Sequence, residues 1–265
     1  MLSFSKQRQI KKDAKRAQPK LHRDMGFAAM EQYKMLRTNL SFVLTEEIKC
    51  PIIGVTSSAR GEGKSTTAVN LAYALAADKK KVLLIDGDLR LPSIAQKMDI
   101  RSTVGLSGLL MTLDVSNMEQ FRTDVLENWY VLPAGTLPPN PSELLGSPKM
   151  EKLLQLLAEQ FDYIVIDLPP VGLVSDALAV SRMITGMVLV VRENFTDKKE
   201  LEDCVRQLDL SNVTVLGFVW NESEESKTRK YKRYSYYSDN SGESAAVGSR
   251  PRAIPERKES KNKLQ

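Results

Sequence analysis

Cysteine and histidine are scarce in this sequence, and their scarcity removes several classes of protein. The 265 residues include two cysteines, Cys50 and Cys204, and one histidine. A zinc cage, an iron–sulfur cluster or a disulfide framework needs ligands or partners at close spacing, and these two cysteines stand alone. Isolated cysteines fit a reducing compartment, so we expect a cytoplasmic protein.

Long apolar runs are also missing. Uninterrupted stretches such as residues 71–77 and 187–191 are far shorter than the about 20 residues that a membrane-spanning helix needs. The basic N-terminus is not followed by the apolar core of a signal peptide. We therefore expect neither a membrane-spanning segment nor a secretory leader.

Charge is divided unevenly along the chain. The net charge is +5, but residues 1–23 carry +7, residues 222–265 carry +4, and the body between them carries −6. Both ends have too few apolar residues to offset the entropy of ordering. We predict flexible tails at 1–25 and 222–265 and one domain at 26–221. A basic tail can attract nucleic acid or anionic lipid, but a solvated end is the simpler interpretation, and we expect no specific nucleic-acid partner.

Hydrophobic periodicity within the body indicates alternating helices and strands. Apolar residues recur at a spacing near 3.6 over 27–43 and again over 65–77, which predicts two amphipathic helices. Short, nearly continuous apolar runs are typical of strands that are buried on both faces of a parallel sheet. The pattern predicts a doubly wound α/β fold with a mainly parallel sheet. The predicted strands are 52–55, 82–85, 130–132, 163–166, 187–191 and 213–220.

A glycine-rich segment joins the first predicted strand to the helix at 65–77. The P-loop pattern is G-x-x-x-x-G-K-[ST]; Ser58 occupies its first glycine position, while Gly63, Lys64 and Ser65 match it. Such a loop surrounds phosphates with backbone N–H groups, its lysine reaches the β- and γ-phosphates, and its hydroxyl can bind Mg²⁺. The alternative is a plain glycine turn followed by an exposed lysine. The predicted nucleotide-binding residues are Ser58, Gly61, Glu62, Gly63, Lys64, Ser65 and Thr66.

Aspartates follow two of the predicted strands. Asp86 ends the run at 82–85, and Asp167 ends the run at 163–166. The carboxyl ends of parallel strands meet at one sheet edge, where the phosphate loop also lies, so both carboxylates can approach Mg²⁺. Each alone could simply cap a loop or a helix. Asp88, two residues past Asp86, is a candidate base or a group that supports the metal ligands, and a simple turn residue is equally compatible.

Three motifs in this order resemble those of the bacterial tyrosine kinases (BY-kinases). Residues 58–66 are similar to their Walker A motif, 82–92 to their Walker A′ motif and 164–170 to their Walker B motif. The related partition and cell-division ATPases carry a signature lysine where this chain has Ala59, which favours the kinase branch. Ser58 and Arg60 also depart from the usual family pattern, but neither removes a catalytic group.

The resemblance implies a P-loop NTPase fold, ATP and Mg²⁺ as cofactors, and transfer of the γ-phosphoryl group to tyrosine. Lys64 would neutralise developing charge, and Ser65 with Asp86 or Asp167 would hold the metal. Asp86 or Asp88 would orient or deprotonate the acceptor. Two further residues, Arg192 and Asn221, would flank the adenine, although a loop role is equally compatible with their positions.

Four of the eight tyrosines fall within seven residues of the C-terminal tail: Tyr231, Tyr234, Tyr236 and Tyr237. The family's cytoplasmic kinases end in such a cluster, which is autophosphorylated. The interleaved basic residues would also suit an RNA-stacking patch, and the segment could form a strand. With a nucleotide site on the same chain, acceptor tyrosines are the stronger hypothesis.

The helix at 27–43 contains Glu31, Lys34 and Arg37, which resemble the family's E-x-x-R-x-x-R oligomerisation motif, with lysine at the first arginine position. The resemblance implies a homo-oligomer that assembles as a ring, although a solvated charged face is equally compatible. The resemblance also implies a membrane-embedded adaptor of the chain-length-regulator type, a protein-tyrosine phosphatase, other protein substrates and a role in capsule or exopolysaccharide synthesis. It would place the protein in the cytoplasm, at the membrane through its partner. The alternative is an ATPase switch that positions complexes on membrane or nucleoid.

Overall fold

The structure is a computed structural model that describes residues 21, 25–45 and 47–222. Most of the two predicted tails, including all four clustered tyrosines, therefore lies outside the described residues. Within the described part, no helix is long and apolar enough to cross a membrane.

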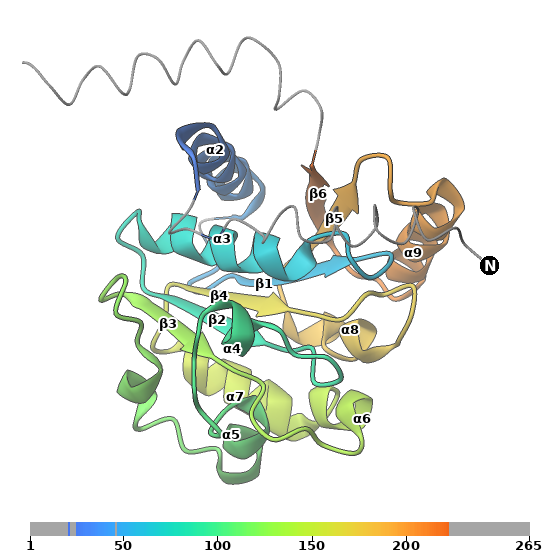
Figure 1. The fold of residues 1–265 in the computed structure, drawn as a ribbon. Coiled ribbons are helices and arrows are strands. Elements are labelled where there is room, and N and C mark those ends of the chain that lie inside the picture. Colours follow the sequence, from blue (N-terminus) through green and yellow to red (C-terminus); the bar gives the residue numbers. More distant parts are fainter. Residues whose placement is uncertain (1–20, 22–24, 46, 223–265) are drawn as a thin grey trace, which may run out of the picture.

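A six-stranded parallel sheet forms the centre of the molecule, with strand order β3-β2-β4-β1-β5-β6 (Figure 1). Each predicted apolar run is a strand, which confirms the predicted fold class. All strands run in one direction, so their carboxyl ends lie at the same edge. The bounds are β1 Ile52–Ser57, β2 Val82–Asp86, β3 Trp129–Leu132, β4 Tyr163–Asp167, β5 Gly186–Arg192 and β6 Val215–Asn221.

Helices cover both faces of the sheet (Figure 1). The upper face in this view carries α3, with α2 packed on it, whereas α5, α7 and α9 pack on the lower face. The bounds of these helices are α2 Phe27–Val43, α3 Lys64–Ala76, α5 Leu106–Thr112, α7 Pro148–Ala158 and α9 Lys198–Leu210. Shorter pieces in the connections are α4 Ile94–Lys97, η1 Met118–Phe121, α6 Pro141–Leu145, α8 Asp176–Ala179 and η2 Ser181–Met183.

Strand β2 illustrates how the sheet separates two hydrophobic layers. Val82 and Leu84 belong to the layer under α3, while Leu83 and Ile85 belong to the layer over α5 and α7. All four side chains are fully buried. Side chains alternate across a strand, so a strand between two helical layers must be apolar at every position. Burial on both faces of the sheet therefore explains the continuous apolar run at 82–85 in the sequence.

The helices that flank the sheet differ in whether a side chain caps their first turn, and the uncapped helix is the one that follows the P-loop. The Ser147 hydroxyl caps α7, and the Asp197 carboxylate caps α9 by accepting backbone hydrogen bonds. In contrast, α3 begins after Gly63 without a side-chain cap and without an acidic residue in its first turn. Its first N–H groups have no intrahelical carbonyl partner and are open to an anion.

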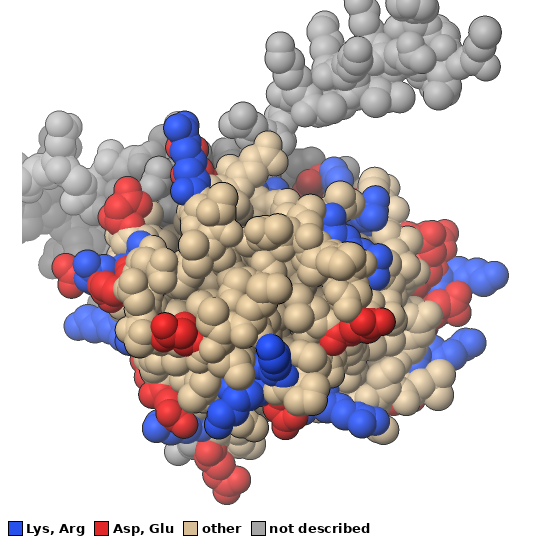
Figure 2. Space-filling model, turned by 90° about the horizontal axis from the view of Figure 1, so that it is seen from below, with Lys and Arg blue, Asp and Glu red and all other residues tan. Residues whose placement is uncertain are grey.

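Figure 2 shows the face of the molecule below the sheet. Basic and acidic side chains are interspersed around the rim of this face, and its centre is largely uncharged. Nucleic acid is bound chiefly through clustered basic groups that neutralise phosphates. The face shown in Figure 2 has no such continuous basic patch.

Candidate nucleotide-binding site

The P-loop runs from the end of β1 to the start of α3. Gly61 and Gly63 adopt left-handed backbone conformations, with φ of 85° and 98°. A side chain at such φ values is strained, and a Cβ on Gly63 would stand 2.1 Å from Nδ2 of Asn221. Glycine at these positions lets the backbone curl toward the uncapped end of α3, as phosphate binding requires.

The Glu62 side chain stabilises this loop through hydrogen bonds. One of these comes from Ser58, which accounts for the serine at the first glycine position of the motif. The Glu62 side chain is fully buried. Its carboxylate accepts hydrogen bonds from the hydroxyl of Ser58 at 2.9 Å, from the N–H of Ala59 at 2.9 Å and from the hydroxyl of Thr196. Because these donors occupy the carboxylate, the predicted nucleotide contact of Glu62 would come from its backbone. Sequence reasoning did not find Thr196, since it lies 134 residues away.

Replacing Gly63 with alanine is expected to weaken ADP binding tenfold or more. The new Cβ would displace the Asn221 amide, and the left-handed φ adds about 1–2 kcal/mol of strain. Calorimetric titration with ADP and thermal unfolding measure the two effects. Gly108→Ala is the matched control: open space surrounds Gly108 within α5, so this change should stabilise the fold by about 0.5 kcal/mol and leave ADP affinity intact. Equal ADP affinities in the two variants would contradict the assigned role of Gly63.

Lys64, at the start of α3, lies among the predicted acidic residues. Its ammonium nitrogen donates to Asp88 Oδ2 at 3.0 Å, to Asp167 Oδ1 at 3.3 Å and to the Ser65 hydroxyl at 3.4 Å. Burial alone would lower the pKa of Lys64, but the charges of Asp167 and Asp88 outweigh it and hold this pKa above its usual value. The structure thus brings together four residues that were predicted from three separate motifs.

Asp86 ends β2 and is fully buried. Its Oδ2 accepts the N–H groups of Ser93 at 3.1 Å and Ile94 at 3.0 Å, so it holds the loop that leads into α4. Burial, followed by the charge of Asp167, raises the pKa of Asp86 to about 7. A bound cation would favour the ionised form of such a carboxyl group.

Asp167, at the end of β4, offers an oxygen that fits a metal ion. Its Oδ1 accepts from Lys64, whereas its Oδ2 is buried without a hydrogen-bond partner among the described residues. Burial raises the pKa of Asp167, and the charge of Lys64 and the hydroxyl of Ser65 offset this only in part. Mg²⁺ takes one or two carboxylates and keeps several waters, so an orphaned carboxylate oxygen beside a P-loop hydroxyl suits it.

Arg192 and Asn221, the predicted adenine-flanking residues, both contact the tip of the P-loop. The Arg192 guanidinium donates to the Gly61 carbonyl at 3.0 Å, and the Asn221 amide donates to the Glu62 carbonyl at 2.8 Å. Arg192 also pairs with Glu222 at 2.6 Å. These contacts place the ends of β5 and β6 beside the loop; an adenine contact stays a prediction.

The predicted oligomerisation residues lie on α2. Lys34 and Glu31 form an exposed ion pair at 2.7 Å. Arg37 instead turns toward its own chain, donating to the Ala74 carbonyl at 3.1 Å and pairing with Asp78 at 3.4 Å. Arg37 therefore anchors α2 to α3, and the other two side chains remain accessible.

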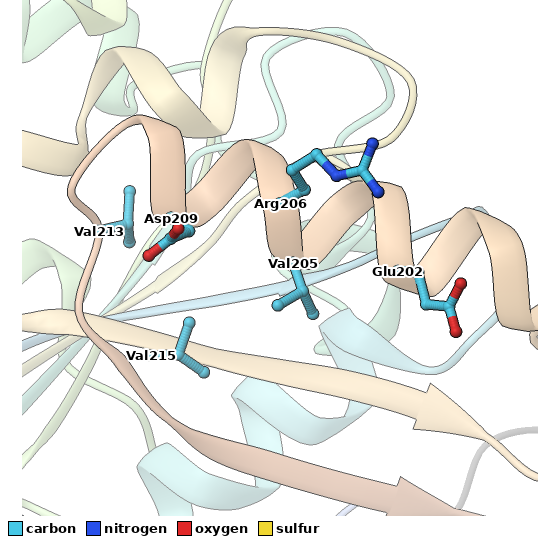
Figure 3. Close-up of a pocket in the computed structure, with 6 residues that line it drawn as sticks. All are labelled: Glu202, Val205, Arg206, Asp209, Val213 and Val215. Atoms are coloured by element: carbon cyan, nitrogen blue, oxygen red, sulfur yellow. The ribbon is translucent and has the colours of Figure 1, made fainter.

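A hollow of about 500 Å³ lies away from the P-loop, between α9 and the amino end of β6 (Figure 3). None of the predicted site residues lines this hollow. Its walls are partly apolar and partly charged, and its position at the opposite end of β6 separates it from the carboxyl edge of the sheet. The lining residues are Glu202, Val205, Arg206, Asp209, Val213 and Val215.

A P-loop ahead of an uncapped helix, with a lysine and three aspartates at the carboxyl edge of a parallel sheet, defines a P-loop nucleoside-triphosphate-binding protein. A family model described as a NUBPL iron-transfer P-loop NTPase of the ParA type matches residues 49–252. Tyrosine-protein kinase YwqD of Bacillus subtilis is 37% identical over 208 residues, which cover 78% of this chain and 85% of that protein. The chain belongs to the bacterial tyrosine kinases, which share this domain, and the resemblance seen in the sequence is confirmed.

Two further comparisons agree. The putative tyrosine-protein kinase CapB of Staphylococcus aureus is 35% identical over 210 residues, covering 79% of this chain and 90% of that protein. The crystal structure of the chimerical protein CapA2B2 superimposes with a TM-score of 0.67 at 32% identity, covering 74% of this chain and 85% of that one.

Proposed function

We propose that this protein transfers the γ-phosphoryl group of ATP to tyrosines of its own C-terminal cluster and of other proteins. The observation that carries the proposal is the cluster of Lys64, Asp88 and Asp167 at the start of the P-loop helix, on a chain of this family. Phosphoryl transfer needs positioned charge rather than covalent catalysis, and this cluster supplies it.

Lys64 has two roles in the proposed mechanism. Without nucleotide it neutralises Asp88 and Asp167. When ATP occupies the loop, its ammonium group turns to the β- and γ-phosphoryl oxygens. Oδ2 of Asp88 then loses its partner, while Oδ1 still accepts the N–H of Leu91 at 3.0 Å. The freed oxygen can accept the proton of the incoming tyrosine hydroxyl. The tyrosine oxygen bonds to the γ-phosphorus, the bond to the β-phosphate oxygen breaks, and ADP leaves.

Asp167 and Ser65 would hold Mg²⁺, with Asp86 close by. The bound ion would draw negative charge from the β- and γ-phosphoryl oxygens. Asp86 keeps its position through the backbone N–H groups of Ser93 and Ile94, whether or not it touches the ion directly. Because the pKa of Asp86 is about 7, a nearby positive charge would shift this carboxyl group toward its ionised form.

The wider setting of the reaction follows from the family. We propose a membrane-embedded adaptor of the chain-length-regulator type that brings the protein to the membrane and activates it. Assembly of several subunits would use the outward side of α2, where Lys34, Met35 and Phe42 are exposed. A phosphatase would reset the tyrosines, and the cycle would control capsule or exopolysaccharide synthesis.

Mass spectrometry of the purified full chain, incubated with Mg-ATP and the adaptor's cytoplasmic segment, tests this function. The proposal expects phosphate on Tyr231, Tyr234, Tyr236 and Tyr237. Phosphate that appears only as free inorganic phosphate would instead support the alternative, an ATPase switch of the partition and cell-division type.

Replacing all four clustered tyrosines with phenylalanine should remove most of the label that the protein transfers to itself. The tail carries a net +4 charge, and each phosphate adds about −1.5 to −2. Native electrophoresis should therefore show a strong charge shift for the wild-type protein and at most a small one for the variant. The variant should still phosphorylate a peptide that copies residues 228–239. Undiminished self-labelling of the variant would overturn the acceptor assignment while leaving the kinase activity in place.

A further inference from the structure

An ion pair outside the phosphate cluster connects the loops at the carboxyl edge of the sheet. The guanidinium of Arg90 donates two hydrogen bonds to the carboxylate of Asp176, from Nε to Oδ2 at 2.8 Å and from Nη2 to Oδ1 at 2.9 Å. The Asp176 side chain is fully buried, whereas 41% of the Arg90 side chain is exposed. Ser142 also donates to Asp176 and accepts from Arg90 at 3.2 Å.

The Asp176 carboxylate is charged at neutral pH. Burial raises the pKa of Asp176, but the hydrogen bonds from Arg90 and Ser142 outweigh it and hold the pKa below its usual value. A buried carboxylate of this kind needs its cationic partner, because an unpaired charge in the interior is costly.

The three partners come from three different connections. Arg90 lies between β2 and α4, Ser142 lies in α6 after β3, and Asp176 begins α8 after β4. The first and third connections follow strands that end in Asp86 and Asp167. The ion pair therefore joins the two segments that carry the proposed metal-binding carboxylates.

The segment around Arg90 is also the one that fixes the acidic groups of the site. Asp88 stands two residues before Arg90 and accepts the N–H of Leu91 at 3.0 Å. Asp86 accepts the N–H groups of Ser93 and Ile94 just beyond it. The pairing of β2 with β4 already fixes the backbone of Asp86 opposite Asp167. Whatever holds the middle of this segment therefore holds Asp88 and the orientation of the Asp86 side chain.

We propose that Arg90 is a positioning residue for phosphoryl transfer: through its two hydrogen bonds to Asp176 it holds the loop that places Asp88 and orients the Asp86 side chain beside Asp167. Arg90 itself does not touch the reacting atoms in this account. The inference rests on the proposed kinase function, because it assigns a role within the same site. Arginine suits this role better than lysine, because lysine lacks the planar fork that binds both carboxylate oxygens.

Steady-state kinetics of Arg90→Ala, Arg90→Lys and Asp176→Asn test the proposal. Arg90→Ala should lower kcat about 10–100-fold and raise the Mg²⁺ concentration for half-maximal rate several-fold, as is usual when a group that orients metal ligands is removed. ADP affinity in EDTA should stay within about twofold of wild type, because the P-loop is untouched. Arg90→Lys should restore part of the rate. Combining Arg90→Ala with Asp176→Asn should cost little more than either change alone.

Arg206→Ala is the matched control. This arginine is 72% exposed and only loosely paired with Asp203 at 4.0 Å, so its removal should change none of these quantities. The proposal is overturned if Arg90→Ala leaves kcat and Mg²⁺ dependence within twofold of wild type. Some loss of thermal stability is expected, because Arg90→Ala leaves the buried Asp176 without its partner. The proposal is also overturned if ADP affinity falls in step with kcat, since the pair would then only support the fold. If the wild-type protein releases only inorganic phosphate, the proposed function fails. The role of Arg90 is then still decided by comparing the rate of phosphate release and its Mg²⁺ dependence between the variants and the wild type.

Discussion

Replacing Lys64 with alanine is expected to lower the rate of tyrosine phosphorylation about 1,000-fold. A preorganised donor that stabilises transition-state charge typically contributes 10²–10³ in rate. Lys64 is placed to do so by its position at the start of α3, among the acidic groups of the site. Rates of phosphotyrosine formation at saturating Mg-ATP give the measurement. Labelling of the Lys64→Ala variant at the wild-type rate would contradict the mechanism.

The same substitution should destabilise the fold, because it leaves a buried carboxylate without its counter-charge. Asp167 is fully buried and pairs with Lys64. Breaking a buried pair costs about 3–5 kcal/mol while the remaining group is charged. The loss should be larger at high pH and shrink as the pH falls, because burial raises the pKa of Asp167 and the carboxyl group takes up a proton more readily. Lys198→Ala is the control, since the Lys198 side chain is 90% exposed, and both its activity and its stability should match wild type.

Replacing Asp86 with asparagine should have opposite effects on stability and activity. The pKa of the buried Asp86 rises from 3.8 to about 7. Below about pH 4 the Asp86 carboxyl group is protonated in both the folded and the unfolded state, so it does not destabilise the fold. As the pH rises, the carboxyl group ionises first in the unfolded state, and the free energy of unfolding falls until the pH exceeds about 7. A shift of this size corresponds to about 4 kcal/mol. In EDTA, Asp86→Asn should recover about 2 kcal/mol of this at pH 8. Its amide oxygen can still accept the N–H groups of Ser93 and Ile94, whereas its amide nitrogen cannot accept the N–H of Asp88.

Thermal unfolding in EDTA at pH 5 and pH 8 measures the effect. An increase of about 2 kcal/mol corresponds to roughly 4–8 °C at this chain length. Phosphorylation by the same variant should fall sharply, because the Mg²⁺ site loses a charge. Asp203→Asn, at an exposed position on α9, should change stability by less than about 0.5 kcal/mol at either pH. A destabilised Asp86→Asn protein at pH 8 would show that the carboxylate belongs to a favourable network instead.

The parts of the fold that sequence reasoning predicted are those with a local physical cause. Every strand appears as an apolar run, because both faces of the sheet are covered by helices. The helix at 27–43 was predicted from its periodicity, and its bounds agree with α2. Short helices such as α4, α6 and α8 were not predicted, because four or five residues carry too little periodicity to identify a helix.

The phosphate site was predictable because its residues are joined by short spacings within three motifs. The hydrogen bond of Glu62 with Thr196 and the ion pair of Arg90 with Asp176 were not predicted, since the partners lie 134 and 86 residues apart. The sequence held one signal for the ion pair of Asp176. This aspartate stands in the apolar segment 171–180, and an acidic group among buried residues needs a partner. The sequence could not say which of the many arginines provides it.

The most direct test of the central claim is the fate of the γ-phosphate. Purified full-length protein would be incubated with ATP labelled at this phosphate, Mg²⁺ and the adaptor's cytoplasmic segment, and label would be counted on tyrosine and as inorganic phosphate. The account predicts label on tyrosine, with Lys64→Ala reducing it about 1,000-fold. Label found only as inorganic phosphate, or phosphotyrosine that persists in the Lys64→Ala variant, would contradict it.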